Sequence, residues 1–332
     1  MTVNNMKTWI KVLIIAVVAT VLTLEGSYAY FQYFTRTRLL VSTTTSLWET
    51  GLLNVTKQAF EAKYPIDLGF LPVGTGQAIQ QAQGGNVDAL LVHSPSNETQ
   101  FLQGGDGSCR KIIAYNFFTI VGPQSDPAGI NGSSVMDALK KIASYGRSNS
   151  TWAWVSRGDG SGTHTKEKSL WAKANFSYAQ ISTESSWFKT SGEGMSLTLS
   201  MANEKGAYTL SDIGTYLKLA KDHTISLVQY LFETKDLLNV YSVIAVNQTR
   251  HPTVNFSNAI TFIKYLISDD CQQLIDNYGK DEYGQSLFHS AVQLLRQNST
   301  TEIVQWIKDY AFINGTECPP EYRDPRYPEL YS

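Results

Sequence analysis

Clustered positive charge is missing from this sequence. No more than two lysines or arginines stand next to each other, and the formal net charge is −2 over 332 residues. Proteins that bind the phosphate backbone of DNA or RNA carry basic patches, so the composition gives nucleic-acid binding little support. Aromatic residues make up 12% and charged residues 17% of the chain, which suits a globular protein large enough for two domains.

Cysteine is also scarce, with three residues in the whole chain. Three cysteines exclude a scaffold built from disulfides, and in an oxidising compartment they leave room for one bridge and one free thiol. Cys271 falls within a helical pattern, whereas Cys109 and Cys318 lie in loop-like sequence. We therefore expect a Cys109–Cys318 disulfide.

The hydrophobic runs of this sequence do not reach the length that a membrane-spanning helix needs. The most apolar segment covers residues 12–24, whereas a spanning helix needs roughly 20 such residues. Lys7 and Lys11 precede it, and a small-x-small site ends at Ala29, as in a secretory signal peptide. We expect residues 1–29 to be a signal peptide, with an uncleaved signal anchor as the alternative, and the protein to be secreted or periplasmic.

Sites for N-linked glycosylation are frequent by contrast. Nine Asn-x-Ser/Thr sequons are present, which favours a secretory route with sugars on surface loops. The predicted acceptors are Asn54, Asn97, Asn131, Asn149, Asn175, Asn247, Asn255, Asn298 and Asn314.

Short apolar runs alternate with amphipathic stretches after the N-terminal segment. Strands are predicted at 38–41, 66–73 and 89–93, with helices at 52–63 and 78–83 between them. This alternation predicts a parallel sheet with helices on both faces, and hence an α/β fold.

A second unit is inserted into the first. The strands at 116–121 and 241–246 are similar in character and flank a middle segment with its own helices and strands. We interpret them as two crossing hinge strands. The prediction is a discontinuous first lobe at 37–122 and 241–332, ending in a helical extension with one long helix from about 290 to 310, and a second lobe at 123–240.

Four polar loops follow predicted strands at their carboxyl ends. They are TTTS (43–46), GTGQ (74–77), HSPSNE (93–98) and SRGDGSGTH (156–164). Ligands bind at this edge of open α/β sheets. Glycines allow close backbone approach, free N–H groups and hydroxyls donate hydrogen bonds, and Arg157 offers a planar fork that matches oxyanion oxygens. The loops therefore favour an anion site.

Catalytic alternatives have weaker support. Ser161 is not the central serine of G-x-S-x-G, because Asp159 and Thr163 occupy the flanking glycine positions, and no histidine has a recognisable triad context. No G-x-x-x-x-G-K-[ST] motif is present, and histidines and cysteines lack metal-ligand spacing. We expect a binding protein that is not an enzyme and needs neither metal nor cofactor.

The segments LLVSTTTSLWETGLL, VGTGQAIQQAQGGNVDALLVHSP and VSRGDGSGTHTKEKSLW closely resemble the tungstate-binding proteins of ABC importers. With later segments, the resemblance runs from about Leu39 to Leu287. It implies the two-lobed type 2 periplasmic-binding-protein fold, an oxyanion held between the lobes and an ABC-type permease as partner, and we expect a monomer. The residues that it implies for the oxyanion are Thr44, Thr45, Ser46, Thr75, Arg157, Ser161, Gly162 and Thr163, and we add Ser94 because it directly follows the strand predicted at 89–93.

The protonation state of the anion separates two ligand classes. Phosphate keeps a proton near neutral pH and needs an acceptor, whereas tungstate and molybdate are unprotonated dianions that suit a pocket of donors. His93 and Ser94 stand where the similar phosphate binders carry an acidic residue, and we expect Asp159 to cap the next helix or to orient Arg157. Tungstate or molybdate is therefore expected. The alternatives are a phosphate or sulfate binder, an adhesion or sensing module, and an enzyme on the same scaffold.

Overall fold

The computed structural model describes residues 13–21, 23, 36–231, 233–297 and 300–331. Residues 13–21 are helical. The predicted cleavage site at Ala29 and the sequon at Asn298 lie outside the described residues. Within the described part of the chain, no helix combines the length and the apolar character that crossing a membrane requires.

The first lobe is built on a mixed sheet with the strand order β10-β4-β9-β3-β1-β2. Strand β1 pairs in parallel with β2 and β3, and β9 runs antiparallel to both β3 and β4. The buried runs of β1 and β3 explain their central place, because strands covered on both faces are continuously apolar. The strands are β1 (Thr37–Thr44), β2 (Ile66–Val73), β3 (Ala89–Val92), β4 (Gly107–Gly122), β9 (Leu238–Val246) and β10 (His289–Ser290).

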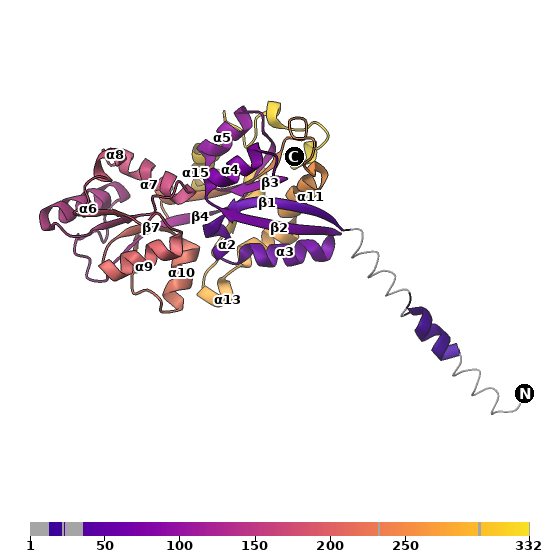
Figure 1. Cartoon of the computed structure of the whole chain (residues 1–332), viewed down its shortest axis with the longest axis horizontal. Helices are drawn as coiled ribbons and strands as arrows, with labels where there is room; N and C mark the ends of the chain where they lie inside the picture. The colour runs from indigo at the N-terminus through magenta and orange to yellow at the C-terminus, as the bar shows by residue number, and fades with distance from the viewer. Residues whose placement is uncertain (1–12, 22, 24–35, 232, 298–299, 332) are drawn as a thin grey trace, which may run out of the picture.

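Helices cover both faces of this sheet (Figure 1). Their apolar sides form one core with the strands, in which Phe60, Phe101 and Phe262 are fully buried. The helices of this lobe before the C-terminal extension are α2 (Thr45–Glu49), α3 (Leu52–Lys63), α4 (Thr75–Gln83), α5 (Pro95–Gln103), α11 (Phe256–Leu266), α12 (Asp269–Asn277) and α13 (Lys280–Tyr283).

The second lobe grows from the end of β4. Residues Phe118–Val121 of β4 pair with β7, and its last residues pair with β8, so this strand belongs to both lobes. A separate two-stranded sheet joins β5 to β6. The elements are α6 (Val135–Asn149), β5 (Trp154–Ser156), α7 (Gly162–Lys173), α8 (Tyr178–Ile181), β6 (Phe188–Thr190), α9 (Met195–Lys205), β7 (Thr209–Asp212), α10 (Ile213–Lys221) and β8 (Val228–Leu231).

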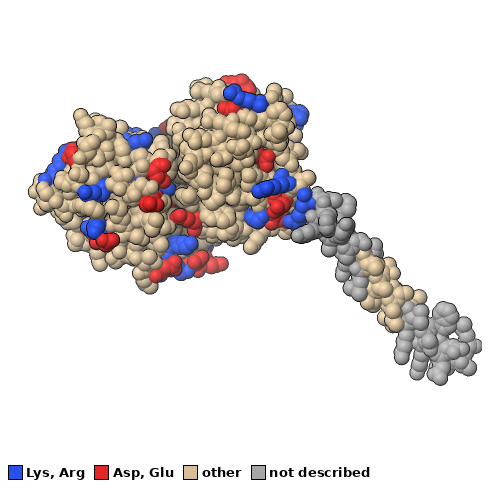
Figure 2. All heavy atoms as spheres, in the orientation of Figure 1, with Lys and Arg blue, Asp and Glu red and all other residues tan. Residues whose placement is uncertain are grey.

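Figure 1 shows the two lobes side by side, with α6 to α10 around one and α3 to α5 and α11 around the other. The chain leaves the first lobe through β4 and returns at Leu238 into β9. The predicted α/β class with two lobes, a discontinuous first lobe and hinge strands is therefore confirmed. On the face drawn in Figure 2, acidic and basic side chains are interspersed rather than gathered by sign.

The C-terminal extension packs on the hinge strands. Ile307 and Ala311 of α15 (Glu302–Ala311) are buried against Ile112 of β4 and Leu238 and Val240 of β9. The single helix predicted from about 290 to 310 is wrong, because α14 (Val292–Arg296) ends before α15 begins. The break falls in a stretch rich in Ser, Thr and Asn, which favour caps and turns over helix interiors.

Two further expectations need correction. Three of the four predicted loops are largely strand or helix: β1 ends at Thr44 and α2 begins at Thr45 within TTTS, and α4 begins at Thr75 within GTGQ. In HSPSNE, Ser94 is the N-cap residue of α5 and Pro95 begins that helix, a position that proline favours. All three cysteines are buried free thiols, so the predicted Cys109–Cys318 disulfide is not formed. Both sulfurs of the predicted pair have other neighbours: Cys109 Sγ accepts from Ser108 Oγ, and Cys318 Sγ lies 3.8 Å from the Pro319 carbonyl oxygen.

Candidate anion-binding site

The arginine loop, residues 156–164 of the second lobe, meets three strand-to-helix junctions of the first lobe. Arg157 Nη2 donates to Thr45 Oγ1 at 3.3 Å, which bridges the lobes. A Cβ placed on Gly162 would lie 2.8 Å from His93 Cε1, and one on Gly74 would lie 3.9 Å from the Asp159 carbonyl oxygen. Residues far apart in the sequence are therefore brought to one place, as the four-loop pattern predicts.

Arg157 is held in a fixed orientation. Its side chain is 2% exposed, and both Nε and Nη2 donate to Asp159 Oδ2, at 3.0 and 2.6 Å. Asp159 Oδ1 accepts from the Ser161 backbone N–H at 3.1 Å. Asp159 therefore orients the guanidinium, as one of the two roles expected from the sequence, while Ser161 caps α7 by accepting from His164 N–H.

Two buried hydroxyls at the loops have no hydrogen-bond partner among the described residues. Thr75 Oγ1 belongs to the first residue of α4, and Thr163 Oγ1 lies in the first turn of α7. A buried hydroxyl without a partner costs about 1–3 kcal/mol, so these two groups are free to bond to a ligand or a water. Thr234 and Ser242, which are not predicted ligand residues, also have such hydroxyls. The hydroxyls of Thr75 and Thr163 come from opposite lobes and both belong to predicted ligand residues.

The other predicted ligand residues have local roles as well. Thr44 caps α2 by accepting from Leu47 N–H, and its hydroxyl lies 3.4 Å from Ser46 Oγ. Ser94 Oγ accepts from Asn97 Nδ2 at 3.0 Å. A capping or accepting hydroxyl oxygen still has its own proton to donate, so these contacts are compatible with a second contact to an anion.

A buried carboxylate near the arginine loop was missed by sequence reasoning. Asp212 ends β7, caps α10 and is 1% exposed, with both oxygens bonded to Thr215. Burial raises the pKa of Asp212 to about 6, and Glu49 raises it while Arg157 lowers it. The sequence predicts a site made of hydrogen-bond donors alone, whereas the structure places the Asp212 carboxylate near Arg157. Both oxygens of this carboxylate, however, accept from Thr215 of α10. The signal in the sequence is an aspartate directly before the stretch that forms α10, a position where aspartate commonly caps a helix.

Two histidines flank the site in opposite hydrogen-bonding states. His164 Nδ1 accepts from Gly160 N–H at 2.9 Å, so its proton is on Nε2. His93 Nδ1 lies 2.8 Å from Asn239 Oδ1. Neither Nε2 has a partner among the described residues. Burial lowers the pKa of both rings, to about 4 for His93, so both are neutral at pH 7.

A second contact between the lobes lies beside the arginine loop. Glu49 at the end of α2 accepts from Ser196 Oγ of α9 through Oε2, at 2.9 Å, and its carbonyl oxygen lies 3.3 Å from Lys218 Nζ of α10. These contacts join elements of different lobes. The structure is therefore a closed arrangement in this region.

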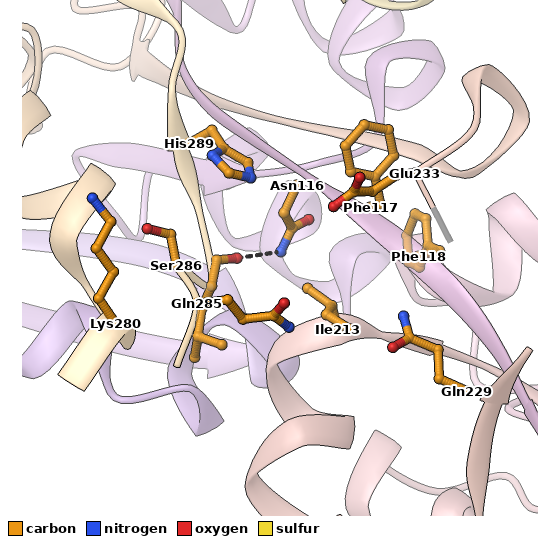
Figure 3. A pocket seen from close by; sticks show the side chains of 11 residues that line it. Asn116, Phe117, Phe118, Ile213, Gln229, Glu233, Lys280, Gln285, Ser286 and His289 are labelled. Atoms are coloured by element: carbon orange, nitrogen blue, oxygen red, sulfur yellow. Dashed lines mark hydrogen bonds between the residues drawn. The ribbon is translucent and has the colours of Figure 1, made fainter. Parts of the chain in front are cut away.

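A separate pocket of about 460 Å³ lies at the hinge (Figure 3). Asn116 and Phe118 of β4, Ile213 of α10 and Leu287 line it, so both lobes contribute. None of the nine predicted ligand residues lines this pocket. The candidate anion-binding loops (43–46, 74–77, 93–98 and 156–164) and the hinge pocket are therefore lined by different residues.

The fold and the loops define a two-lobed solute-binding protein whose polar loops meet at the boundary between the lobes. The chain belongs to the PBP superfamily, whose domain model matches residues 29–270. It is similar to the tungstate-binding protein TupA of Peptoclostridium acidaminophilum, with 38% identity over 253 residues that cover 75% of this chain and 84% of the relative. It is also similar to the tungstate-binding protein TupA of Campylobacter jejuni, with 35% identity over 231 residues that cover 69% of this chain and 82% of the relative.

Solved structures agree with this assignment. The tungstate-binding protein TupA from Desulfovibrio alaskensis G20 is 37% identical, with a TM-score of 0.65, and the match covers 77% of this chain and 99% of that chain. The tungstate ABC transporter structure from Geobacter sulfurreducens is 38% identical, with a TM-score of 0.64 and coverages of 73% and 98%.

Proposed function

We propose that this protein captures a tetrahedral oxyanion dianion, tungstate or molybdate, between its lobes, without catalysing a reaction. The observation that carries the proposal is a pair of buried hydroxyls, Thr75 of the first lobe and Thr163 of the second, which have no hydrogen-bond partner among the described residues. The relatives named for tungstate binding support the same ligand.

The proposed ligand set is the one expected from the sequence. Protein groups donate hydrogen bonds to the oxide oxygens, and no protein atom coordinates the metal. Arg157 and the N-terminus of α7 serve the anion from the second lobe, and the hydroxyls of α2 and α4 serve it from the first. The nine residues are Thr44, Thr45, Ser46, Thr75, Ser94, Arg157, Ser161, Gly162 and Thr163.

We further propose that the protein is extracytoplasmic and monomeric, and that it delivers its ligand to an ABC-type permease. The proposed lobes are those predicted from the sequence, 37–122 with 241–332 and 123–240. Support comes from the relatives' names and from the accessible sequons. Asn54, Asn131, Asn149, Asn175 and Asn314 are exposed, whereas Asn97, Asn247 and Asn255 are half-buried. We expect the exposed asparagines to be the ones that accept sugars.

Thermal unfolding of the full chain with tungstate, molybdate, sulfate and phosphate at matched ionic strength tests the proposal. A ligand that binds the folded state alone stabilises it by RT ln(1 + [L]/Kd), about 4 kcal/mol at a thousandfold excess over Kd. A large shift with tungstate or molybdate and little with the other two is expected. The shift should disappear in Arg157→Ala and persist in Arg147→Ala, whose guanidinium pairs with Glu184 on the surface. No shift with any anion contradicts the proposal.

A further inference from the structure

A chain of side-chain amides connects the hinge with the anion-binding loops. It begins where Asn116 Nδ2 donates to the Leu287 carbonyl oxygen at 3.1 Å (Figure 3). A backbone carbonyl can only accept, so the nitrogen of the Asn116 amide must face it. Asn116 Oδ1 then accepts from Asn239 Nδ2 at 2.9 Å.

The orientation of Asn239 decides the tautomer of His93. Asn239 Nδ2 also donates to Tyr241 Oη at 2.8 Å, which leaves Oδ1 facing His93 Nδ1. An amide oxygen accepts, so the proton of the neutral imidazole is on Nδ1. His93 Nε2 therefore presents a lone pair, in contrast to the Nε2–H of His164.

His93 Nε2 lies at the anion-binding loops. The ring is 2% exposed, and a Cβ on Gly162, the residue before Thr163, would lie 3.1 Å from Nε2. Arg157 acts electrostatically on the ring. A lone pair is the wrong partner for an oxide oxygen, whereas a protonated Nε2 is a charged donor.

Among the described residues, the charged groups around the site leave a bound dianion without a cation that would balance its charge. The guanidinium of Arg157 is balanced by Asp159, whose carboxylate lies 2.6 Å from it. Asp212 and Glu49 add negative charge nearby, because Asp212 responds to both Glu49 and Arg157. A ligand with two negative charges therefore enters a site whose arginine is already paired.

We propose that His93 takes up one proton on Nε2 when the dianion binds, and then donates this Nε2–H to an oxide oxygen. A buffer or solvent acid gives the proton, one N–H bond forms, and the imidazole changes from neutral to a single positive charge. The inference rests on the proposed oxyanion function and adds the residue that sets its pH dependence.

The direction of the pH dependence follows from the groups that face the ring. Burial lowers the pKa of His93, the hydrogen bond to Asn239 raises it and the charge of Arg157 lowers it. The net result is a pKa of about 4. Tyr241 and Phe118, the rings packed against it, are uncharged, since burial raises the pKa of Tyr241 well above its ordinary value. A bound dianion raises the pKa of His93, so affinity increases as the pH falls between about 4 and the pKa in the complex.

Calorimetric titration of the full chain with sodium tungstate at pH 7.5, in two buffers of different ionisation enthalpy, counts the protons taken up. Net proton uptake of up to one proton per tungstate is expected, with Kd rising by up to about tenfold per pH unit below the pKa of His93 in the complex. His93→Gln keeps a neutral donor but cannot be protonated, so its uptake should fall to near zero and its Kd should lose the pH dependence. His223→Asn, at an exposed histidine of the second lobe, should behave as the parent.

Each outcome has a separate meaning. Tungstate binding without proton uptake overturns the role of His93 and leaves the proposed function intact, whereas failure of the parent to bind tungstate overturns the proposed function. Uptake that persists in His93→Gln and is lost in Asp212→Asn assigns the proton to Asp212 and also overturns the inference. Should His93→Gln not fold, ¹⁵N spectra of the parent's histidines decide: one ring must become imidazolium on adding tungstate, and no such change contradicts the proposal.

Discussion

At the scale of single residues, the unpartnered hydroxyls separate ligand binding from stability. Replacing Thr75 or Thr163 by Val keeps the shape and removes a buried polar atom that has no partner among the described residues. We expect each variant to keep its free energy of unfolding or gain about 1 kcal/mol, and to bind tungstate at least about tenfold more weakly. Chemical denaturation and calorimetry measure the two quantities.

Thr209→Val is the matched control for these variants. Thr209 is equally buried, but its Oγ1 donates to the Val155 carbonyl oxygen at 2.7 Å. This variant should lose about 1–2 kcal/mol of unfolding free energy and keep its affinity. A loss of stability in Thr75→Val or Thr163→Val, with unchanged binding, would show that these hydroxyls have structural roles instead.

The sequence revealed the chemistry of the site more fully than its geometry. Hydroxyls, glycines and Arg157 stand within short motifs, so their type and order could be read directly. The contacts that give them roles join distant positions, as between Thr45 and Arg157, 112 residues apart, and between His93 and Asn239, 146 residues apart. No local pattern encodes such pairs, which explains why the tautomer of His93 and the burial of Asp212 were not predicted.

At the scale of elements, helix α7 contains a carboxyl group whose protonation depends on folding. Glu167 is 2% exposed and accepts from Trp154 Nε1 and Ser156 Oγ. Burial raises its pKa from 4.5 to about 7. The folded protein therefore holds a proton that the unfolded chain loses, so this contribution to stability is complete below pH 4.5 and is lost as the pH rises to about 7.

Glu167→Gln should remove this dependence. The loss in the parent over that range is on the order of 3 kcal/mol, and Gln keeps an acceptor for Trp154. Urea denaturation of parent and variant at several pH values between 4.5 and 8 measures the difference in the free energy of unfolding. Glu204→Gln, at an exposed carboxylate, should run parallel to the parent. Parallel curves for Glu167→Gln and the parent would contradict the prediction.

Elements with strong patterns were predicted best. The bounds expected for α3 and β2 agree with the structure, because Gly51 and Pro65 flank α3, and Pro65 and Gly74 flank β2. The 16 residues of β4 exceed the predicted strand, since its extra length depends on pairing with β9 in one lobe and β7 in the other. Tertiary partners, rather than local propensity, set such ends.

At the scale of the whole molecule, Glu49 links closure of the lobes with ligand retention. Its carboxylate accepts from Ser196 across the lobe boundary, so opening the cleft must break this contact. Glu49→Ala should raise the dissociation rate constant of tungstate about fivefold with little change in the association rate constant. Glu282→Ala is the control, because its ion pair with Lys221 also joins the lobes but is exposed and worth little. Equal dissociation rate constants in the two variants would contradict the role of Glu49.

The C-terminal extension stabilises the first lobe through buried charges. Glu317 Oε2 lies 2.7 Å from Lys111 Nζ, with the two side chains 11% and 3% exposed, and the Glu317 carbonyl oxygen accepts from fully buried Arg110. Removing one partner of a buried pair leaves the other charge uncompensated, which costs about 3–5 kcal/mol. This cost is much larger than the value of a surface pair.

Glu317→Ala should therefore lose about 3 kcal/mol of unfolding free energy, while its tungstate affinity stays within about twofold of the parent because Lys111 lies on β4 away from the anion-binding loops. Differential scanning calorimetry and ligand titration measure the two effects. Glu321→Ala, an exposed position in the same extension, should change stability by less than about 0.5 kcal/mol. If the two variants unfold at the same temperature, the extension is peripheral to the fold; if Glu317→Ala alone is destabilised, the extension is part of the first lobe's core.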